Sequence, residues 1–178
     1  MRNSYSLAIA AAAGAVVIAS SVPAAAAPGD STATITITGG ALSITVPDAA
    51  GNLGAERPNT VAGGTISGAL GQVQVNDARS AAAGSGWVAS AISTAFTPPS
   101  GPAIAASAVS YNAGPITKVG TATYTANNPA SLTGVSPVVT ATGITGDNSA
   151  TWNPTISVAI PGGVAANVYS ATFTHSVV

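Results

Sequence analysis

The chain has 178 residues, of which 5% are charged and none is cysteine, and its formal net charge at pH 7 is −1. Four basic residues are too few for the positive patch that nucleic acids or anionic membranes attract, so we expect neither partner. Hydrophobic residues make up 47% of the sequence, which excludes the composition of a disordered chain. Without disulfides, the hydrophobic core or a bound ion must stabilise the fold.

The N-terminus has the pattern of a secretory signal peptide. Arg2 supplies a positive charge, an uncharged apolar run covers residues 7–22, and small residues follow at 24–27. This order of basic, apolar and small residues is typical of exported precursors. A membrane anchor is the alternative, but the run is short and rich in alanine. We predict that residues 1–26 are removed after Ala26 and that the mature chain, residues 27–178, is a single domain.

Alternation of apolar and polar residues recurs along the mature chain. The runs cover residues 32–38, 41–46, 72–76, 155–160 and 169–178. A period of two places the apolar side chains on one face of a β-strand, and Thr, Val and Ile favour strands. Clusters of Gly, Pro and Asn predict turns between strands, among them 84–86 and 146–148, and an irregular loop over 48–64. We find no helix signal after the signal peptide. The sequence predicts an all-β fold, an antiparallel β-sandwich of the Ig-like or Greek-key type.

The two tryptophans are candidate contacts for a partner. Trp87 lies on one face of a predicted strand with Ala89 and Ala91. Trp152 is at an even-numbered position, like the apolar residues of the run 155–160, so it is expected on the same strand face as they are. An exposed indole offers a stacking surface, whereas a buried indole fills the core of a sandwich. For both Trp87 and Trp152, partner binding and core packing are the two interpretations.

Asp77 and Arg79 are the third and fourth candidates for partner binding. They are two residues apart on one predicted strand, so their side chains share a face. They could form a recognition pair at the surface, or a local ion pair beside the turn predicted after them. An exposed pair of this kind contributes about 0–1 kcal/mol to stability.

The motifs of catalytic and metal sites are missing from the sequence. His175 is the only histidine and shares the apolar face of the last run, so we expect it to be half-buried and hydrogen-bonded. Asp48 with Asn52, or Asp147 with Asn148, does not match the spacing of a calcium loop. No nucleophile motif and no closely spaced pair of carboxylates is present. We therefore expect no catalytic activity, no cofactor and no metal.

Several stretches resemble WxL-type cell-wall-associated domains. They include an Asp-x-Arg pattern, a short Gly-containing loop and a Gly-Trp that opens a strand. The stretches are Val73–Arg79, Gly86–Ser90, Phe96, Ile104–Tyr111, Trp152–Pro161 and Tyr169–Val177. The family is named for two Trp-x-Leu motifs. Here Ala89 stands at the first Leu position, and His175 and Val177 stand at the Trp and Leu positions of the second motif.

The resemblance implies non-covalent binding to peptidoglycan or to other surface proteins. We therefore predict a secreted, non-catalytic cell-surface protein that is extracellular or associated with the cell wall. The alternative is a structural subunit of a surface layer or fibre, which self-associates by β-strand pairing. The low charge and the open Thr-rich strand at 32–38 favour this alternative.

Overall fold

The fold is built almost entirely from β-strands. The computed structural model describes residues 33–54 and 63–178. The strands are β1 (Leu42–Thr45), β2 (Gly64–Ala69), β3 (Val73–Ser93), β4 (Val109–Asn112), β5 (Ile116–Ala126), β6 (Ser136–Trp152), β7 (Thr155–Ile160) and β8 (Phe173–Val177). Within the described ranges, the one helical element is the three-residue 3-10 turn η1 (Ala106–Ala108). The prediction of an all-β fold is confirmed.

Every strand of the described residues belongs to the unit Thr36–Val178. The predicted signal peptide and its cleavage site after Ala26 lie outside the described residues. No helix among the described residues is long and apolar enough to cross a membrane.

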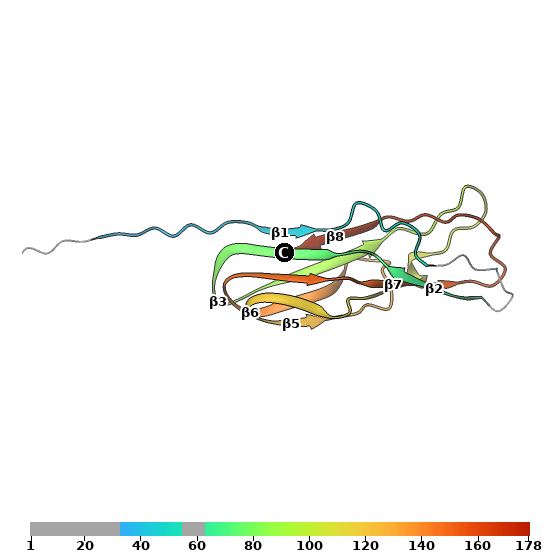
Figure 1. The fold of residues 1–178 in the computed structure, drawn as a ribbon. Coiled ribbons are helices and arrows are strands. Elements are labelled where there is room, and N and C mark those ends of the chain that lie inside the picture. The colour runs from blue at the N-terminus through green and yellow to red at the C-terminus, as the bar shows by residue number, and fades with distance from the viewer. Residues whose placement is uncertain (1–32, 55–62) are drawn as a thin grey trace, which may run out of the picture. The chain divides into compact units, whose positions relative to one another are not determined.

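Two antiparallel sheets pack against each other as a sandwich (Figure 1). The larger sheet has the order β1-β3-β6-β5, and β8 also pairs with β3; the smaller has the order β2-β7-β4. The registers follow the predicted alternation: Ile44 lies opposite Val75 in the larger sheet, and Ile66 lies opposite Val158 in the smaller.

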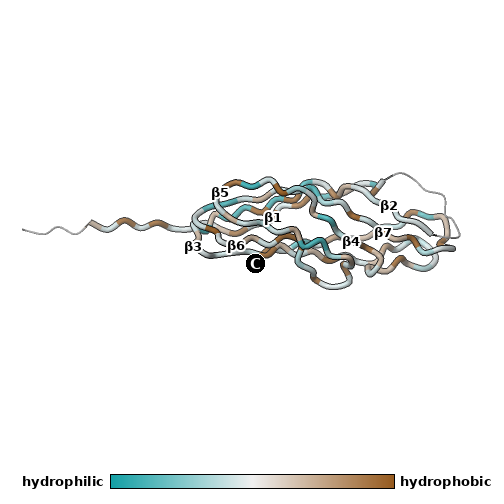
Figure 2. Tube along the Cα trace, turned by 90° about the horizontal axis from the view of Figure 1, so that it is seen from below, coloured by the Kyte–Doolittle hydropathy of each residue, from teal (hydrophilic) through white to brown (hydrophobic). Residues whose placement is uncertain are grey.

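The core lies between the inner faces of the two sheets. In β3 the residues Val73 and Val75 are fully buried and their neighbours are exposed, and in β7 Ile156 and Val158 are buried in the same alternating way. Hydropathy therefore alternates along the strands, as Figure 2 shows. Burial of these aliphatic side chains is the main stabilising term in a chain without disulfides.

Two glycine-containing segments predicted as turns are instead parts of long strands. β3 has 21 residues and includes 84–86, and β6 has 17 residues and includes 146–148. The two strands pair with each other along their length, but the register shifts repeatedly between Asp77 and Trp87. Ser80, with a φ of 51°, and several glycines adopt positive φ there. A β-bulge and a turn both need residues that adopt positive φ, so a glycine-rich stretch of sequence is compatible with either.

The predicted strand at 32–38 has no strand partner within the described residues, 33–38. Pairing at the start of β1 ends where the Gly40 N–H donates to the Ala78 carbonyl and the Ala78 N–H donates to Ala41. Beyond this point β3 bulges, so its edge no longer runs straight beside the preceding residues. The prediction of a strand is wrong for 33–38, because these residues are exposed and belong to no strand of the described chain.

Candidate functional site

Three of the four candidate residues lie in one hydrogen-bonded network. The Asp77 side chain is fully buried, and the Arg79 guanidinium binds it through two bonds, Nε–Oδ1 at 2.8 Å and Nη2–Oδ2 at 2.9 Å. Asn148 Nδ2 donates to Oδ2 at 3.1 Å, and the Arg79 backbone N–H donates to Oδ1 at 3.1 Å. Hydrogen bonding by Arg79 outweighs burial and lowers the pKa of the Asp77 carboxyl, which therefore stays ionised.

Asn148 joins this ion pair to two aromatic side chains. Its Oδ1 accepts a hydrogen bond from Trp87 Nε1 at 3.0 Å and another from the Tyr124 hydroxyl at 3.2 Å. The rings of Trp87 and Tyr124 are tilted against each other with centroids 5.7 Å apart. The network therefore links β3, β5 and β6 at the place where the β3–β6 register shifts.

The arrangement favours the structural interpretation of these residues. Trp87 is 2% exposed and Asp77 is fully buried, so neither can contact a partner without a rearrangement of the core. Arg79 is the most accessible of the group, with 36% of its side chain exposed, and its Nη2 also donates to the Gly86 carbonyl at 3.1 Å. A buried ion pair whose polar atoms are satisfied can fix one register between strands.

Sequence reasoning missed Asn148 and Tyr124 as members of this network. Asn148 was expected in a turn, and only its place in β6 puts it opposite Asp77. Its neighbour Asp147 was also expected in a turn, but its Oδ1 accepts hydrogen bonds from the backbone N–H and the hydroxyl of Ser80, which lies on β3, 67 positions away in the chain.

Trp152, the fourth candidate, belongs to a second buried cluster. It is 2% exposed, and its Nε1 donates to the Tyr111 hydroxyl at 2.8 Å. The hydroxyl in turn lies 3.3 Å from His175 Nε2. The tautomer of His175 decides which of these two atoms donates, because a hydroxyl that already accepts from Trp152 can still donate its proton or accept a second one.

The same cluster keeps His175 uncharged. His175 Nδ1 is buried without a hydrogen-bond partner among the described residues, and burial lowers the pKa of the imidazole to about 4. Burial also raises the pKa of the Tyr111 hydroxyl. The expectation of a half-buried, hydrogen-bonded His175 is confirmed.

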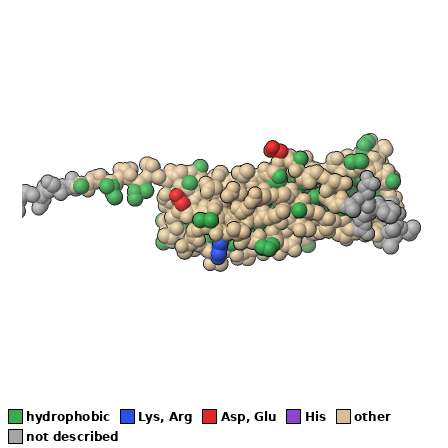
Figure 3. Space-filling view, viewed as in Figure 1, with side chains coloured by type: hydrophobic (Ala, Val, Ile, Leu, Met, Phe, Trp, Pro, Cys, Tyr) green, Lys and Arg blue, Asp and Glu red, His purple; other side chains and the backbone are tan. Residues whose placement is uncertain are grey.

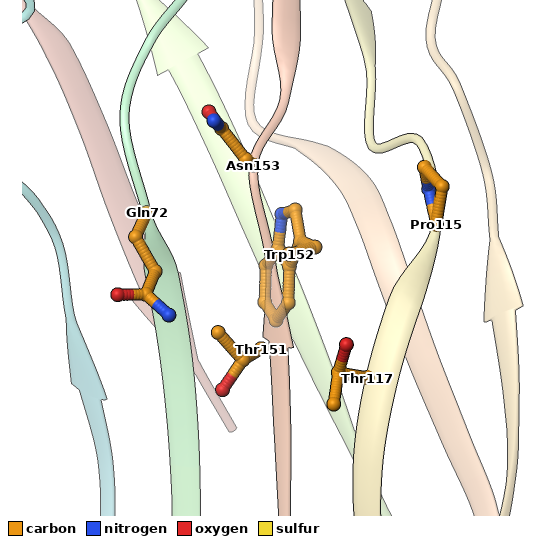
Figure 4. Close-up of a pocket in the computed structure, with 6 residues that line it drawn as sticks. All are labelled: Gln72, Pro115, Thr117, Thr151, Trp152 and Asn153. Atoms are coloured by element: carbon orange, nitrogen blue, oxygen red, sulfur yellow. The ribbon is translucent and has the colours of Figure 1, made fainter.

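A polar hollow of about 500 Å³ borders Trp152 (Figure 4). Gln72 lies on one side of the indole, and Pro115 and Thr117 lie on the other. No acidic or basic side chain is among the residues that line this hollow, so the hydroxyls of Thr117 and Thr151 have no general base beside them there. Since Trp152 is almost fully buried, the hollow gives no stacking surface.

The larger cavity is an apolar groove of about 940 Å³. We define the apolar groove by the loop 46–53, the β2 and β7 side chains Ile66, Val158 and Ile160, and the segment 164–175, with Phe96 and Ile104 also in its lining. Asp48 is the one carboxylate among these lining residues. Several of the apolar side chains keep accessible surface, above all Val168, which is 75% exposed.

Sparse charge also characterises the surface beyond the groove. On the face that Figure 3 shows, acidic and basic side chains are few and separated. The described residues contain no group of three or more His, Asp or Glu side chains that could hold a metal ion.

Comparison of the chain with protein-family models, with characterised proteins and with solved structures gives no match. The resemblance to WxL-type domains therefore stays a prediction. The functional argument depends on the geometry of the groove and on the sequence itself.

Proposed function

We propose that this chain is a secreted, non-catalytic cell-surface protein that binds other surface proteins through the apolar groove. The observation that carries the proposal is the groove itself, whose lining includes Ile66, Phe96, Val158, Ile160 and Phe173. Apolar patches of this extent on a folded domain are typical of binding sites for other molecules. The signal-peptide pattern and the resemblance to WxL domains support a place on the cell surface.

The groove favours a polypeptide over a wall polysaccharide. Carbohydrate recognition would use exposed aromatic rings, but Trp87 and Trp152 are buried, and the rings that line the groove are buried (Phe96) or half-buried (Tyr169 and Phe173). The groove instead lies beside two stretches of strand, β2 and β7, and its lining is mostly aliphatic. An extended segment with apolar side chains at alternate positions fits such a lining, because every second side chain can enter it.

The proposal is tested by sedimenting the purified chain with two preparations, bacterial envelopes that retain their surface proteins and cell walls stripped of protein. We expect saturable binding to the first and little to the second. Val168→Asp places a charge at the rim of the groove and should weaken binding about tenfold. Val135→Asp is the matched control, because Val135 is also exposed but does not line the groove.

Three outcomes would contradict the proposal. Equal binding to stripped walls would show that the wall polymer is the ligand. Equal loss with Val168→Asp and Val135→Asp would show that charge alone matters. Binding to neither preparation would leave the groove without a partner of this class.

A further inference from the structure

We propose that the segment bound in the apolar groove is residues 33–38 of a second copy of this chain. The inference rests on the proposed function of the groove as a docking site for an extended polypeptide, and it names the polypeptide. Each copy would insert Ile35 and Ile37 between the groove-lining side chains of the next copy.

The donor segment has the pattern that the groove requires. Ile35 and Ile37 alternate with Thr34, Thr36 and Thr38, and the two isoleucines are 85% and 79% exposed. Neither belongs to a strand of the described chain. Aliphatic side chains left in water at alternate positions of a chain can be buried together on one face when the segment becomes a strand.

The charges of the two surfaces also match. No charged residue lies between Asp30 and Asp48, so the donor segment is neutral over its whole length. Among the described residues that line the groove, Asp48 in the loop 46–53 is the one acidic side chain, and no Lys or Arg is present. The donor segment therefore brings no charge of its own into the groove, and burial of an unpaired charge would be the main penalty of such an interface.

Along the chain, β1 lies between the donor segment and the groove-lining loop 46–53. Gly39 and Gly40 lie against Arg79 and Ala78, just before β1 begins. The groove-lining loop 46–53 starts directly after β1 ends. The chain thus enters β1 at the end remote from this loop, and contact between the two regions of different copies is head-to-tail. Head-to-tail contacts that do not close into a ring extend into a fibre.

Paired cysteines test the contact, because the native chain contains no cysteine. The variant Ile35→Cys with Val168→Cys can link the donor segment to the groove. The control Ile35→Cys with Val135→Cys places the second thiol at a similarly exposed position that does not line the groove. Both are made in the chain secreted by a bacterial host and are oxidised mildly. We expect a ladder of disulfide-linked oligomers from the first variant and far less from the second.

Sedimentation velocity measures the same contact without cross-links. Ile35→Asp with Ile37→Asp should weaken self-association about tenfold or more, because it puts charge on the inserted face. Thr34→Asp with Thr36→Asp adds the same charge to the opposite face and should have a much smaller effect. Comparison of the two double variants distinguishes insertion of the isoleucine side chains from simple repulsion between charged segments.

A chain that stays monomeric at all concentrations and forms no interchain disulfide would overturn this inference. A disulfide formed within one copy would do so as well, because the segment would then fill its own groove. If the chain is monomeric but Val168→Asp still abolishes its binding to envelope proteins, the proposed function stands and only the identity of the bound segment is wrong. If neither self-association nor envelope binding depends on Val168, both proposals fail.

Discussion

Removal of the Arg79 guanidinium should expose how strongly the Asp77 network stabilises the fold. In Arg79→Met the aliphatic stem remains, but the Asp77 carboxylate loses two charge-assisted hydrogen bonds, at 2.8 and 2.9 Å. Breaking a buried ion pair from one side costs about 3–5 kcal/mol when both charges are buried. Arg79 is 36% exposed, and Asn148 still donates to the carboxylate, so we expect about 2–3 kcal/mol here.

The free energy of unfolding is measured by urea titration with tryptophan fluorescence, since Trp87 lies in this network and Trp152 lies elsewhere in the core. Lys118→Met is the matched control. Its charge is exposed and lies 5.8 Å from the centre of the Tyr124 ring, so its loss should cost less than about 1 kcal/mol.

Acid titration gives an independent check on the same pair. Because Arg79 lowers the pKa of Asp77, the pair stabilises the wild-type fold above about pH 4, and this contribution is lost as the pH falls below that value. Arg79→Met should lose this component of the acid transition. Equal destabilisation by Arg79→Met and Lys118→Met, or an unchanged acid transition, would refute the reasoning.

Three further predictions concern the core. The pKa of His175 is about 4 in the fold and about 6.5 when unfolded, so the free energy of unfolding should fall by at most about 3 kcal/mol as the pH drops from 6.5 to 4. In His175→Gln, urea titrations over this pH range should show a smaller fall. Tyr111→Phe leaves Trp152 Nε1 and His175 Nε2 without their partner and should lower the free energy of chemical unfolding by about 1–3 kcal/mol. The control Tyr169→Phe removes only the exposed hydrogen bond to the Ala165 carbonyl and should cost under about 1 kcal/mol. Gly86→Ala places a Cβ 2.7 Å from the Ala141 carbonyl oxygen and should lower the thermal midpoint by several degrees, for about 1–3 kcal/mol, whereas Gly134→Ala meets no atom within 4 Å and should be close to neutral.

Local alternation predicted the strands well, because each strand face is set by side chains two residues apart. Val73 and Val75, Ile156 and Val158, and the apolar face of β8 all lie where the period of two places them. The parity of Trp87 and Trp152 likewise agrees with their burial. These features depend on residues that are close in sequence, so a single sequence contains the information.

The groove and the Asn148 network depend on residues that are distant in sequence. The groove combines the loop 46–53 with β7 and with the segment 164–175, and no local pattern relates these three. Asn148 contacts Asp77 across 71 positions of the chain. The glycines beside Asn148 gave a turn signal, and only pairing between β3 and β6 distinguishes a bulge from a turn there.

The order of the sheets also sets how fast this chain can fold. Among the paired strands of the described residues, only β5 and β6 are consecutive in the chain, while the other pairs join distant segments such as Val73 and Trp152. Closing such long loops costs entropy before the contacts form, and all-β domains of this kind fold in milliseconds to seconds. The β5–β6 hairpin is therefore the natural starting point, and β3 must find its place on β6 afterwards. Until it does, the longest strand of the protein stays open to pairing with another chain.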